Sequence, residues 1–137
     1  MTSGQAIGVI LNSVTSLTNI VSTRIFNGNR PTGTTVPCVN YYEMPGGKNK
    51  YSEQVATYSI NCRATTAETA LQLAKLVDET FNGISGTGMY GIASSGTVFS
   101  INRSWTIQRQ GLIPEPDDGI YNAPVDICIV YPNGTAT

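Results

Sequence analysis

The chain has 137 residues, of which 12% are charged, and eight Lys and Arg against nine Asp and Glu leave a net charge of −1. This length suits a single domain with one core. Because there is no basic run, the sequence gives no support for a DNA-binding protein. There is also no histidine, which removes the usual general base and the commonest metal ligand, so we expect neither an enzyme nor a zinc protein.

The charged fraction is about half of the ~25% that is typical of soluble domains. Ser, Thr, Asn and Gly are abundant instead. A surface of neutral polar groups suits permanent contact with other subunits. No signal peptide or membrane span is visible, because the longest apolar run, residues 6–11, is interrupted by Gly8.

The first predicted element is a helix. Apolar side chains recur at helical spacing from Ile7 to Val21, which predicts one amphipathic helix over residues 4–22 with Ser3 as the candidate cap. Turn residues at 27–33 then predict an exposed loop.

A β-hairpin is predicted next. Residues 36–43 have apolar side chains on both faces, as in a strand that is partly covered on each side. The tip at residues 44–50 turns the chain back, so this strand should pair antiparallel with residues 55–64. In that second strand the even positions are apolar and the odd positions after Val55 are polar, which is typical of a half-buried strand.

A second helix follows directly. The run from Thr65 to Glu68 is a Ser/Thr-x-x-Glu capping box, which predicts the start of a helix. An apolar stripe continues to Phe81, and Asn82 with Gly83 offers a helix end.

Residues 83–96 are rich in Gly and Ser and contain a formal GxGxxG match at 86–91. We reject a dinucleotide site there, because a helix precedes these glycines where the motif requires a strand. A flexible connection is favoured. From Val98 the alternation predicts a long strand to Gln108, with a bend or bulge near Arg103.

Residues 110–123 contain Pro and acidic residues and predict an exposed loop, and a last strand runs from about Pro124 to Tyr131. The order of elements predicts an α+β fold: a single domain over residues 1–137, with an antiparallel sheet of about four strands and two helices packed on one face.

Two sets of side chains can carry chemistry. Cys38, Cys62 and Cys128 are widely spaced in apolar strand sequence, which is typical of buried free thiols. The acids of the 110–123 loop can in principle hold a hard cation or act as an acid/base pair. They lack the spacing of an EF-hand loop, so we interpret them as a solvated acidic loop and predict no metal, cofactor or catalytic residue.

Aromatic side chains lie on the predicted strands without interleaved Lys or Arg, so core and subunit packing explains them better than stacking on bases or sugars. These residues are Tyr41, Tyr42, Tyr58, Trp105 and Tyr131.

Three stretches carry a resemblance to known proteins: the strand at residues 36–42, the strand-cap-helix run YSINCRATTAETALQLA at residues 58–74, and the ending YNAPVDI at residues 121–127. Together they resemble the tail-terminator and tail-completion proteins of long-tailed bacteriophages. The resemblance covers most of the chain through a pattern of strand, polar break and alanine-rich helix.

This resemblance implies a small α+β virion subunit that forms a ring, usually a hexamer. The ring would terminate the tail tube and join the tail to the head connector, so the partners would be the tail tube protein and head-connector or neck proteins. Assembly would take place in the cytoplasm of the bacterial host, and DNA would pass through without specific binding. The resemblance implies no catalytic residue and no cofactor.

Candidate contact residues follow from the loops and strands. Strand arginines with few nearby charges often find partners across subunits. The candidates for subunit or partner contact are Met44, Lys48 and Lys50 at the hairpin tip and Arg63, Arg103 and Arg109 on strands. Whether the two lysines touch a partner or are solvated turn residues stays open. Glu115, Asp117 and Asp118 are predicted to line the channel, where carboxylates would repel DNA phosphates.

Two alternatives stay open. Another neck, head-completion or tail-tube-associated structural protein would share the fold class and differ in its partner. A small-ligand-binding domain or enzyme would need a pocket with convergent polar groups, which the sequence does not indicate.

Overall fold

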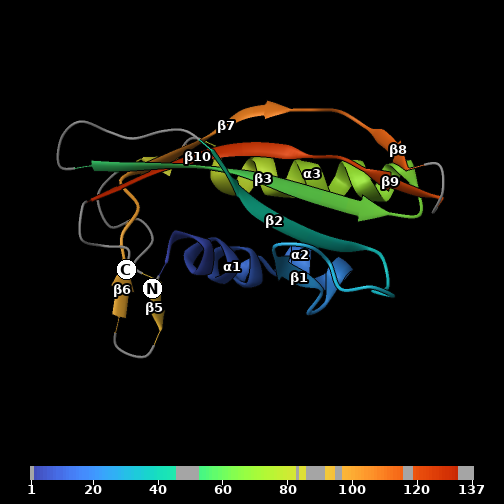
Figure 1. The fold of residues 1–137 in the computed structure, drawn as a ribbon, viewed down its shortest axis with the longest axis horizontal. Coiled ribbons are helices and arrows are strands. Elements are labelled where there is room, and N and C mark those ends of the chain that lie inside the picture. The colour runs from blue at the N-terminus through green and yellow to red at the C-terminus, as the bar shows by residue number, and fades with distance from the viewer. Residues whose placement is uncertain are drawn as a thin grey trace.

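A computed structural model describes residues 2–45, 53–82, 84–85, 92–94, 97–115 and 119–132. Its longest strands run along the long axis of the molecule (Figure 1). In chain order the elements are α1 (Ser3–Ser13), α2 (Thr15–Val21), β1 (Ile25–Asn27), β2 (Cys38–Met44), β3 (Glu53–Ala64), α3 (Ala67–Phe81), β4 (Ile84–Ser85), β5 (Ile92–Ser94), β6 (Thr97–Phe99), β7 (Arg103–Arg109), β8 (Ile113–Glu115), β9 (Ile120–Asn122) and β10 (Val125–Pro132).

The main sheet is built around β3, its longest strand. The strand order is β1-β2-β3-β10-β7-β4, and β9 pairs with the end of β3 and with β8. The predicted hairpin is confirmed, because β2 and β3 are antiparallel with Cys38 opposite Arg63 and Met44 opposite Thr57. The described pairs are antiparallel with one exception, since β1 runs parallel to β2.

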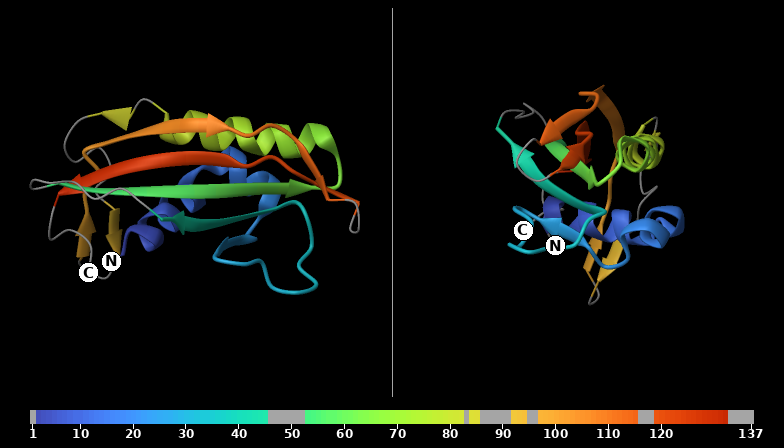
Figure 2. Two further views of the ribbon diagram at one scale, coloured as in Figure 1. Left: turned by 45° about the horizontal axis from the view of Figure 1, so that its top comes forward. Right: turned by 90° about the vertical axis from the view of Figure 1, so that its right-hand side faces the viewer.

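All three helices pack on one face of this sheet (Figure 2). The alternation in β3 is confirmed: its even positions from Ala56 to Ala64 are buried and belong to the core cluster. The facing side chains of β10, among them Ile127 and Ile129, complete the sheet side of the core. None of the described helices has the length and apolar character needed to cross a membrane.

α1 is held to the sheet through two tyrosines. The Tyr41 hydroxyl donates a hydrogen bond of 2.9 Å to the Gly4 carbonyl, and the Tyr58 hydroxyl lies 2.5 Å from Ser3 Oγ. The two rings meet edge to face with centroids 6.2 Å apart, a favourable geometry for aromatic pairs. Burial raises the pKa of the Tyr58 hydroxyl to about 12, although its hydrogen bond with Ser3 acts in the opposite direction.

The prediction of one continuous N-terminal helix over residues 4–22 is wrong, because the structure has two helices there, α1 and α2. The helix breaks at Val14, which adopts an extended conformation with φ −85° and ψ 100°. Side chains compete with the helical backbone before the break: Asn12 Nδ2 donates to the Gly8 carbonyl, and Ser13 Oγ donates to the Ile10 carbonyl. The cap is Thr2, which forms a capping box with Gln5, and Ser3 is the first helical residue.

The cap of α3 also differs by one residue from the predicted capping box. Thr66 is the N-cap, and its hydroxyl accepts a hydrogen bond from the Thr69 backbone amide at 3.3 Å. Glu68 therefore lies in the first turn, where a carboxylate still favours the positive end of the helix dipole. The helix end at Phe81 agrees with the prediction.

The long strand predicted from Val98 to Gln108 is two strands. β6 pairs with β5 in a separate two-stranded sheet, and β7 of the main sheet begins at Arg103. The buried positions change from odd to even numbers there: Phe99 and Ile101 are buried, and the next buried residue is Ser104. The predicted irregularity near Arg103 is therefore confirmed, and it ends one strand and starts another.

The fold is thus a mixed α and β domain with more strands and more helices than predicted. The main sheet has eight strands where about four were expected, and the described chain has three helices where two were expected. The added strands are short, with two or three residues each in β1, β4, β8 and β9. Such segments carry too few positions to display an alternation in the sequence.

Gly8 allows the close approach of α1 to Tyr41, which gives a first prediction. A Cβ atom added at Gly8 would lie 2.5 Å from the Tyr41 hydroxyl oxygen, whereas the next nearest atom, Cζ of the Tyr41 ring, is 3.6 Å away. Gly8→Ala should therefore destabilise the protein by roughly 1–3 kcal/mol, as overpacking does. In a Tyr41→Phe background the same substitution should be neutral or stabilising, because alanine is the better helix former by about 1 kcal/mol. Urea unfolding of the four proteins measures this, and an equal cost in both backgrounds would contradict it.

Candidate functional site

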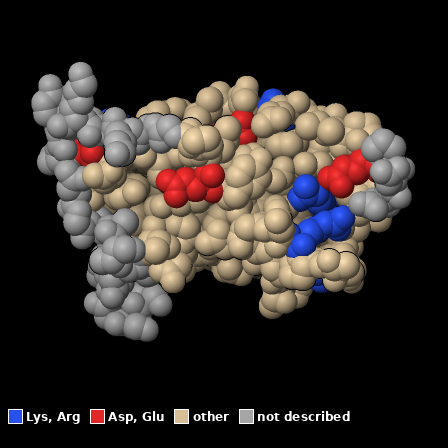
Figure 3. Space-filling view, in the orientation of Figure 1, with Lys and Arg blue, Asp and Glu red and all other residues tan. Residues whose placement is uncertain are grey.

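The sheet face opposite the helices, the open face, carries mainly polar side chains. The pairing register places Tyr42, Ser59, Asp126 and Gln108 in one row across four strands, all on this face. In β2, β3 and β10 these positions are out of phase with the core residues of the same strand, because successive side chains of a strand point to opposite faces. In the view of Figure 3 most of the surface is uncharged, with basic side chains gathered at one end beside acidic ones.

A polar groove of about 340 Å³ lies on the open face where β2, β3, β8 and β9 meet. Three amides lie beneath it and are almost fully buried: Asn40 at 4% exposure, Asn61 at 7% and Asn122 at 7%. Tyr42 and Ile113 flank it and are exposed at 47% and 42%. The groove therefore combines hydrogen-bonding groups at depth with two apolar side chains at the surface.

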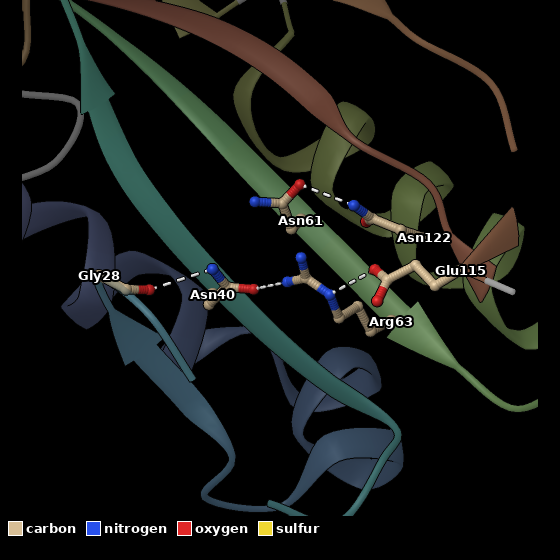
Figure 4. Close-up of polar contacts among 6 residues, drawn as sticks. All are labelled: Gly28, Asn40, Asn61, Arg63, Glu115 and Asn122. Carbon is tan, nitrogen blue, oxygen red and sulfur yellow. Dashed lines mark hydrogen bonds and ion pairs between the residues drawn. The ribbon is translucent and has the colours of Figure 1, made fainter. Parts of the chain in front are cut away.

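A chain of polar contacts crosses the strands beside this groove (Figure 4). Asn40 Nδ2 donates to the Gly28 carbonyl at 3.0 Å, and Asn40 Oδ1 accepts from the Arg63 guanidinium. Arg63 Nε donates in turn to Glu115 Oε1 at 2.9 Å, which makes an ion pair with side chains 18% and 27% exposed. This network ties β2, β3, β8 and the turn after β1 together on the open face.

Asn122 is incompletely bonded. Its Nδ2 donates to Asn61 Oδ1 at 2.9 Å, but its own Oδ1 has no hydrogen-bond partner within the described chain. A buried acceptor without a donor costs about 1–3 kcal/mol. Such groups are uncommon in folded proteins, and each needs a physical explanation.

Asp126 is also buried on the open face, at 2% exposure. Gln108 Nε2 donates to its Oδ2 at 2.7 Å, and Gln110 Nε2 contacts both carboxylate oxygens at 3.1 and 2.9 Å. A register shift in β7 between its pairs with Ile127 and Asp126 turns Gln108 toward this face. The carboxylate is therefore held by neutral amide donors.

The three arginines predicted as subunit contacts each have an acidic neighbour in their own chain. Arg63 pairs with Glu115, Arg103 Nη1 lies 3.1 Å from Glu53 Oε2, and Arg109 Nη1 lies 3.9 Å from Asp78 Oδ2. The premise that few charges lie near them is therefore wrong, because distant strands bring these acids into reach. Their contact role, like that of Met44 at the end of β2, stays a prediction.

The structure joins two residues that the sequence assigned to different surfaces, since the contact candidate Arg63 pairs with the channel candidate Glu115. The Arg63 guanidinium thus places a positive charge 2.9 Å from the Glu115 carboxylate. Lys48, Lys50, Asp117 and Asp118 lie outside the described residues.

The three cysteines are buried free thiols, as predicted. Burial raises the pKa of the Cys62 thiol to about 12 and also raises the pKa of Cys128. Burial raises the pKa of Cys38 as well, although nearby Arg30 lowers it in part. Protonated thiols are poor nucleophiles and metal ligands. Within the described ranges no group of three Cys, Asp or Glu is placed to hold a metal ion.

The three amide side chains of the groove were not predicted as site residues from the sequence. The odd positions of β3 marked Ser59 and Asn61 as polar, and the alternation correctly put them on the face away from the core. Nothing in the sequence joins Asn61 to Asn122, which is 61 positions away and reaches it only through the β3–β9 pairing. The sequence does not indicate a pocket with convergent polar groups, whereas the folded chain brings such groups together in this groove.

Trp105 lies on the open face and is 39% exposed, opposite Cys128 in the register. Core packing within the chain does not account for it, whereas Tyr41, Tyr58 and Tyr131 are buried in the core cluster. Ile107, at the register shift of β7, is 49% exposed.

Comparison with known proteins identifies the fold. No family model matches the sequence, and no curated protein is similar to it. Among solved structures, a chain of the virion of a native gene transfer agent particle has the same fold, with a TM-score of 0.68 over 96% of both chains. The two sequences are 14% identical, so the similarity establishes the fold.

The polar network predicts unequal costs for two arginine substitutions. Arg63→Met would leave Asn40 Oδ1 and Glu115 without their donor at a largely buried site, which should cost about 1–3 kcal/mol of stability. Arg103→Met is the matched control: that side chain is 49% exposed, and its ion pair should contribute less than about 1 kcal/mol. Urea unfolding compares the two, and equal losses would contradict a structural role for the Arg63 network.

The buried Cys62 thiol and Tyr58 hydroxyl predict that the folded protein is less stable at alkaline pH. Cys62 and Tyr58 have pKa values raised to about 12 from 9.0 and 10.0, so above pH 9 the folded chain keeps protons that the unfolded chain loses. Their stabilising contribution is complete below pH 9 and decreases as the pH rises toward 12. Urea unfolding at pH 8, 9, 10 and 11 should show this decrease, and Cys62→Ala should reduce the part that begins near pH 9. A constant free energy of unfolding across the series would contradict the assignment.

Proposed function

We propose that this chain is a structural subunit of a tailed phage or phage-like virion, and that it forms a ring that terminates the tail tube and joins it to the head connector. The observation that carries the proposal is the likeness in fold to a chain of a gene transfer agent virion over 96% of both chains. It agrees with the resemblance of the sequence to tail-terminator proteins. A structural role is also consistent with thiols that burial keeps protonated.

The distribution of exposed apolar residues supports a ring. Trp105 and Tyr42 are exposed on the open face, and Val9 and Leu71 are each 40% exposed on α1 and α3. Apolar side chains thus lie on two opposite sides of the subunit. A contact between the open face of one copy and the helices of the next is heterologous, and such contacts close into a ring when the rotation between copies allows it.

The low charge of the subunit suits this role. Neutral polar groups and paired ions let subunits pack without burying unpaired charge, which is costly. DNA would pass through the ring without specific binding, in keeping with a net charge of −1. Glu115, Asp117 and Asp118 remain our candidates for the channel wall, although Glu115 forms an ion pair with Arg63.

The ring is tested by the mass of the purified protein across a concentration series, followed by negative-stain imaging. We expect a closed oligomer with a central hole that binds isolated tail tubes at one end. Binding at the head-connector side would assign the protein to another position in the neck. A protein that stays monomeric at every concentration, and also with tail tubes, would contradict the proposal.

Two charge substitutions test the heterologous contact. Trp105→Lys on the open face and Leu71→Lys on α3 should each abolish the ring, because each puts a charge into an apolar contact. An equimolar mixture of the two variants retains one intact interface and should stop at a dimer. Thr32→Lys, in the exposed loop between β1 and β2, adds the same charge elsewhere and should assemble like the wild type. Rings from either variant alone would overturn this packing.

A further inference from the structure

β5 and β6 form a small sheet of their own, which we call the arm. The arm extends away from the main sheet, its strands run crosswise to those of the sheet, and β5 contacts α1 (Figure 1 and Figure 2). Among the described residues, neither of its strands pairs with the main sheet. A two-stranded sheet is only marginally stable in water by itself, so the arm would gain stability from a further strand at one of its edges.

The base of the arm is fixed to the core. Phe99, the last residue of β6, is buried, and its ring centroid lies 5.1 Å from that of Tyr131. Ile101 is buried as well. The Asn102 amide then donates a hydrogen bond to the Val130 carbonyl at 2.7 Å. These contacts hold the end of β6 on the core, and the rest of the arm projects from there.

The arm lacks the features that keep exposed strand edges from pairing with other chains. Natural edge strands are commonly guarded by charged residues, especially Lys, and by Pro. Residues 83–102, which include both strands of the arm, contain no charged residue and no Pro. β8 of the main sheet, in contrast, contains Pro114 and Glu115. The composition of the arm therefore favours pairing with another strand.

The main sheet has a free edge on β7. β10 pairs with β7 along one side, whereas β4 pairs only with Arg103 and Ser104 on the other side. No strand of the described chain pairs with the remainder of that side, residues 105–109. The Thr106 amide is bonded there to Asn82 Oδ1, at the long distance of 3.4 Å. A strand from another chain would therefore find backbone groups to pair with at this edge.

The free edge of β7 matches the arm in length and in chemistry. Trp105 and Ile107 are 39% and 49% exposed along it. Exposed apolar side chains on an unpaired strand edge are typical of a site that pairs with another chain. The free stretch is short, which suits strands of three residues such as β5 and β6.

The arm and β7 lie on opposite sides of the molecule (Figure 1 and Figure 2). Two complementary surfaces on opposite sides of one chain make a heterologous contact, in which each copy binds the next. β1, at the other edge of the main sheet, is less suited to receive the arm of another copy because α1 of its own chain packs against it.

We propose that the arm of one copy pairs with the free edge of β7 in the next copy, so that the sheet continues from subunit to subunit. This inference rests on the ring proposed above and assigns its main-chain contact. Pairing of this kind takes its affinity from backbone hydrogen bonds. It therefore suits a chain in which only 12% of the residues are charged.

Amide hydrogen exchange of the wild-type protein tests this pairing directly. Exchange is followed by mass spectrometry of proteolytic peptides, in the monomer at low concentration and in the ring at high concentration. We expect residues 92–99 and 105–109 to exchange roughly tenfold or more slowly in the ring, because new backbone hydrogen bonds must open before exchange. Residues 28–34, in the loop between β1 and β2, should exchange equally in both states.

The outcomes separate this inference from the ring itself. A ring in which residues 92–99 keep their monomer rate would overturn the role of the arm and leave the ring intact. Protection of the arm without protection of residues 105–109 would overturn β7 as its receiver. A wild type that never assembles, even with tail tubes, would overturn the ring and this pairing together.

Thr97→Lys tests the arm by substitution, because a lysine on an edge strand opposes pairing with another chain. Thr32→Lys is the matched control, since it makes the same change in the loop between β1 and β2. We expect Thr97→Lys to weaken assembly about tenfold or more in sedimentation, with the thermal midpoint of the monomer unchanged. Assembly of Thr97→Lys equal to that of Thr32→Lys would overturn the contact.

Discussion

The structure depends on the separation of the two faces of β3. Its even positions are apolar and enter the core, and its odd positions carry Ser59, Asn61 and Arg63 on the open face. A shift of one residue in pairing would exchange the faces and place these polar groups under the helices. Because β2 and β10 pair with β3 along most of its length, the same separation is imposed on the whole centre of the sheet.

The two faces are stabilised by different forces. On the helix side, burial of aliphatic and aromatic side chains supplies the main favourable term. On the open face, amides and ions are removed from water and must be paired inside the protein. Asn40, Arg63 and Glu115 satisfy one another, whereas Asn122 Oδ1 has no donor within the described part of the chain. The open face thus pairs most of its buried polar groups but leaves this one acceptor unpaired there.

The composition of the open face is compatible with the proposed role. A subunit of a virion ring must fold alone and still favour contact with its neighbours. Paired charges and neutral amides keep the cost of burying the open face low, and Tyr42, Ile113 and Trp105 provide apolar area to bury. In the ring proposed above, the open face would act through shape and hydrogen bonding and would set the orientation of the neighbouring subunit.

The sequence by itself determined the local elements with strong periodicity. The β2–β3 hairpin, the core positions of β3, the course of α3 to Phe81 and the irregularity near Arg103 follow from side-chain spacing and turn residues, which are local properties. Only the tertiary structure decided what lies close together. Glu115 reaches Arg63 across 52 positions, and Asn122 reaches Asn61 across 61, because β9 pairs with β3 and β8 pairs with β9. β8 and β9 are too short to show a pattern in the sequence, so these contacts could not be predicted from it. The groove could not be predicted for the same reason: it is made by strand pairing between distant residues, and no single stretch of sequence encodes it.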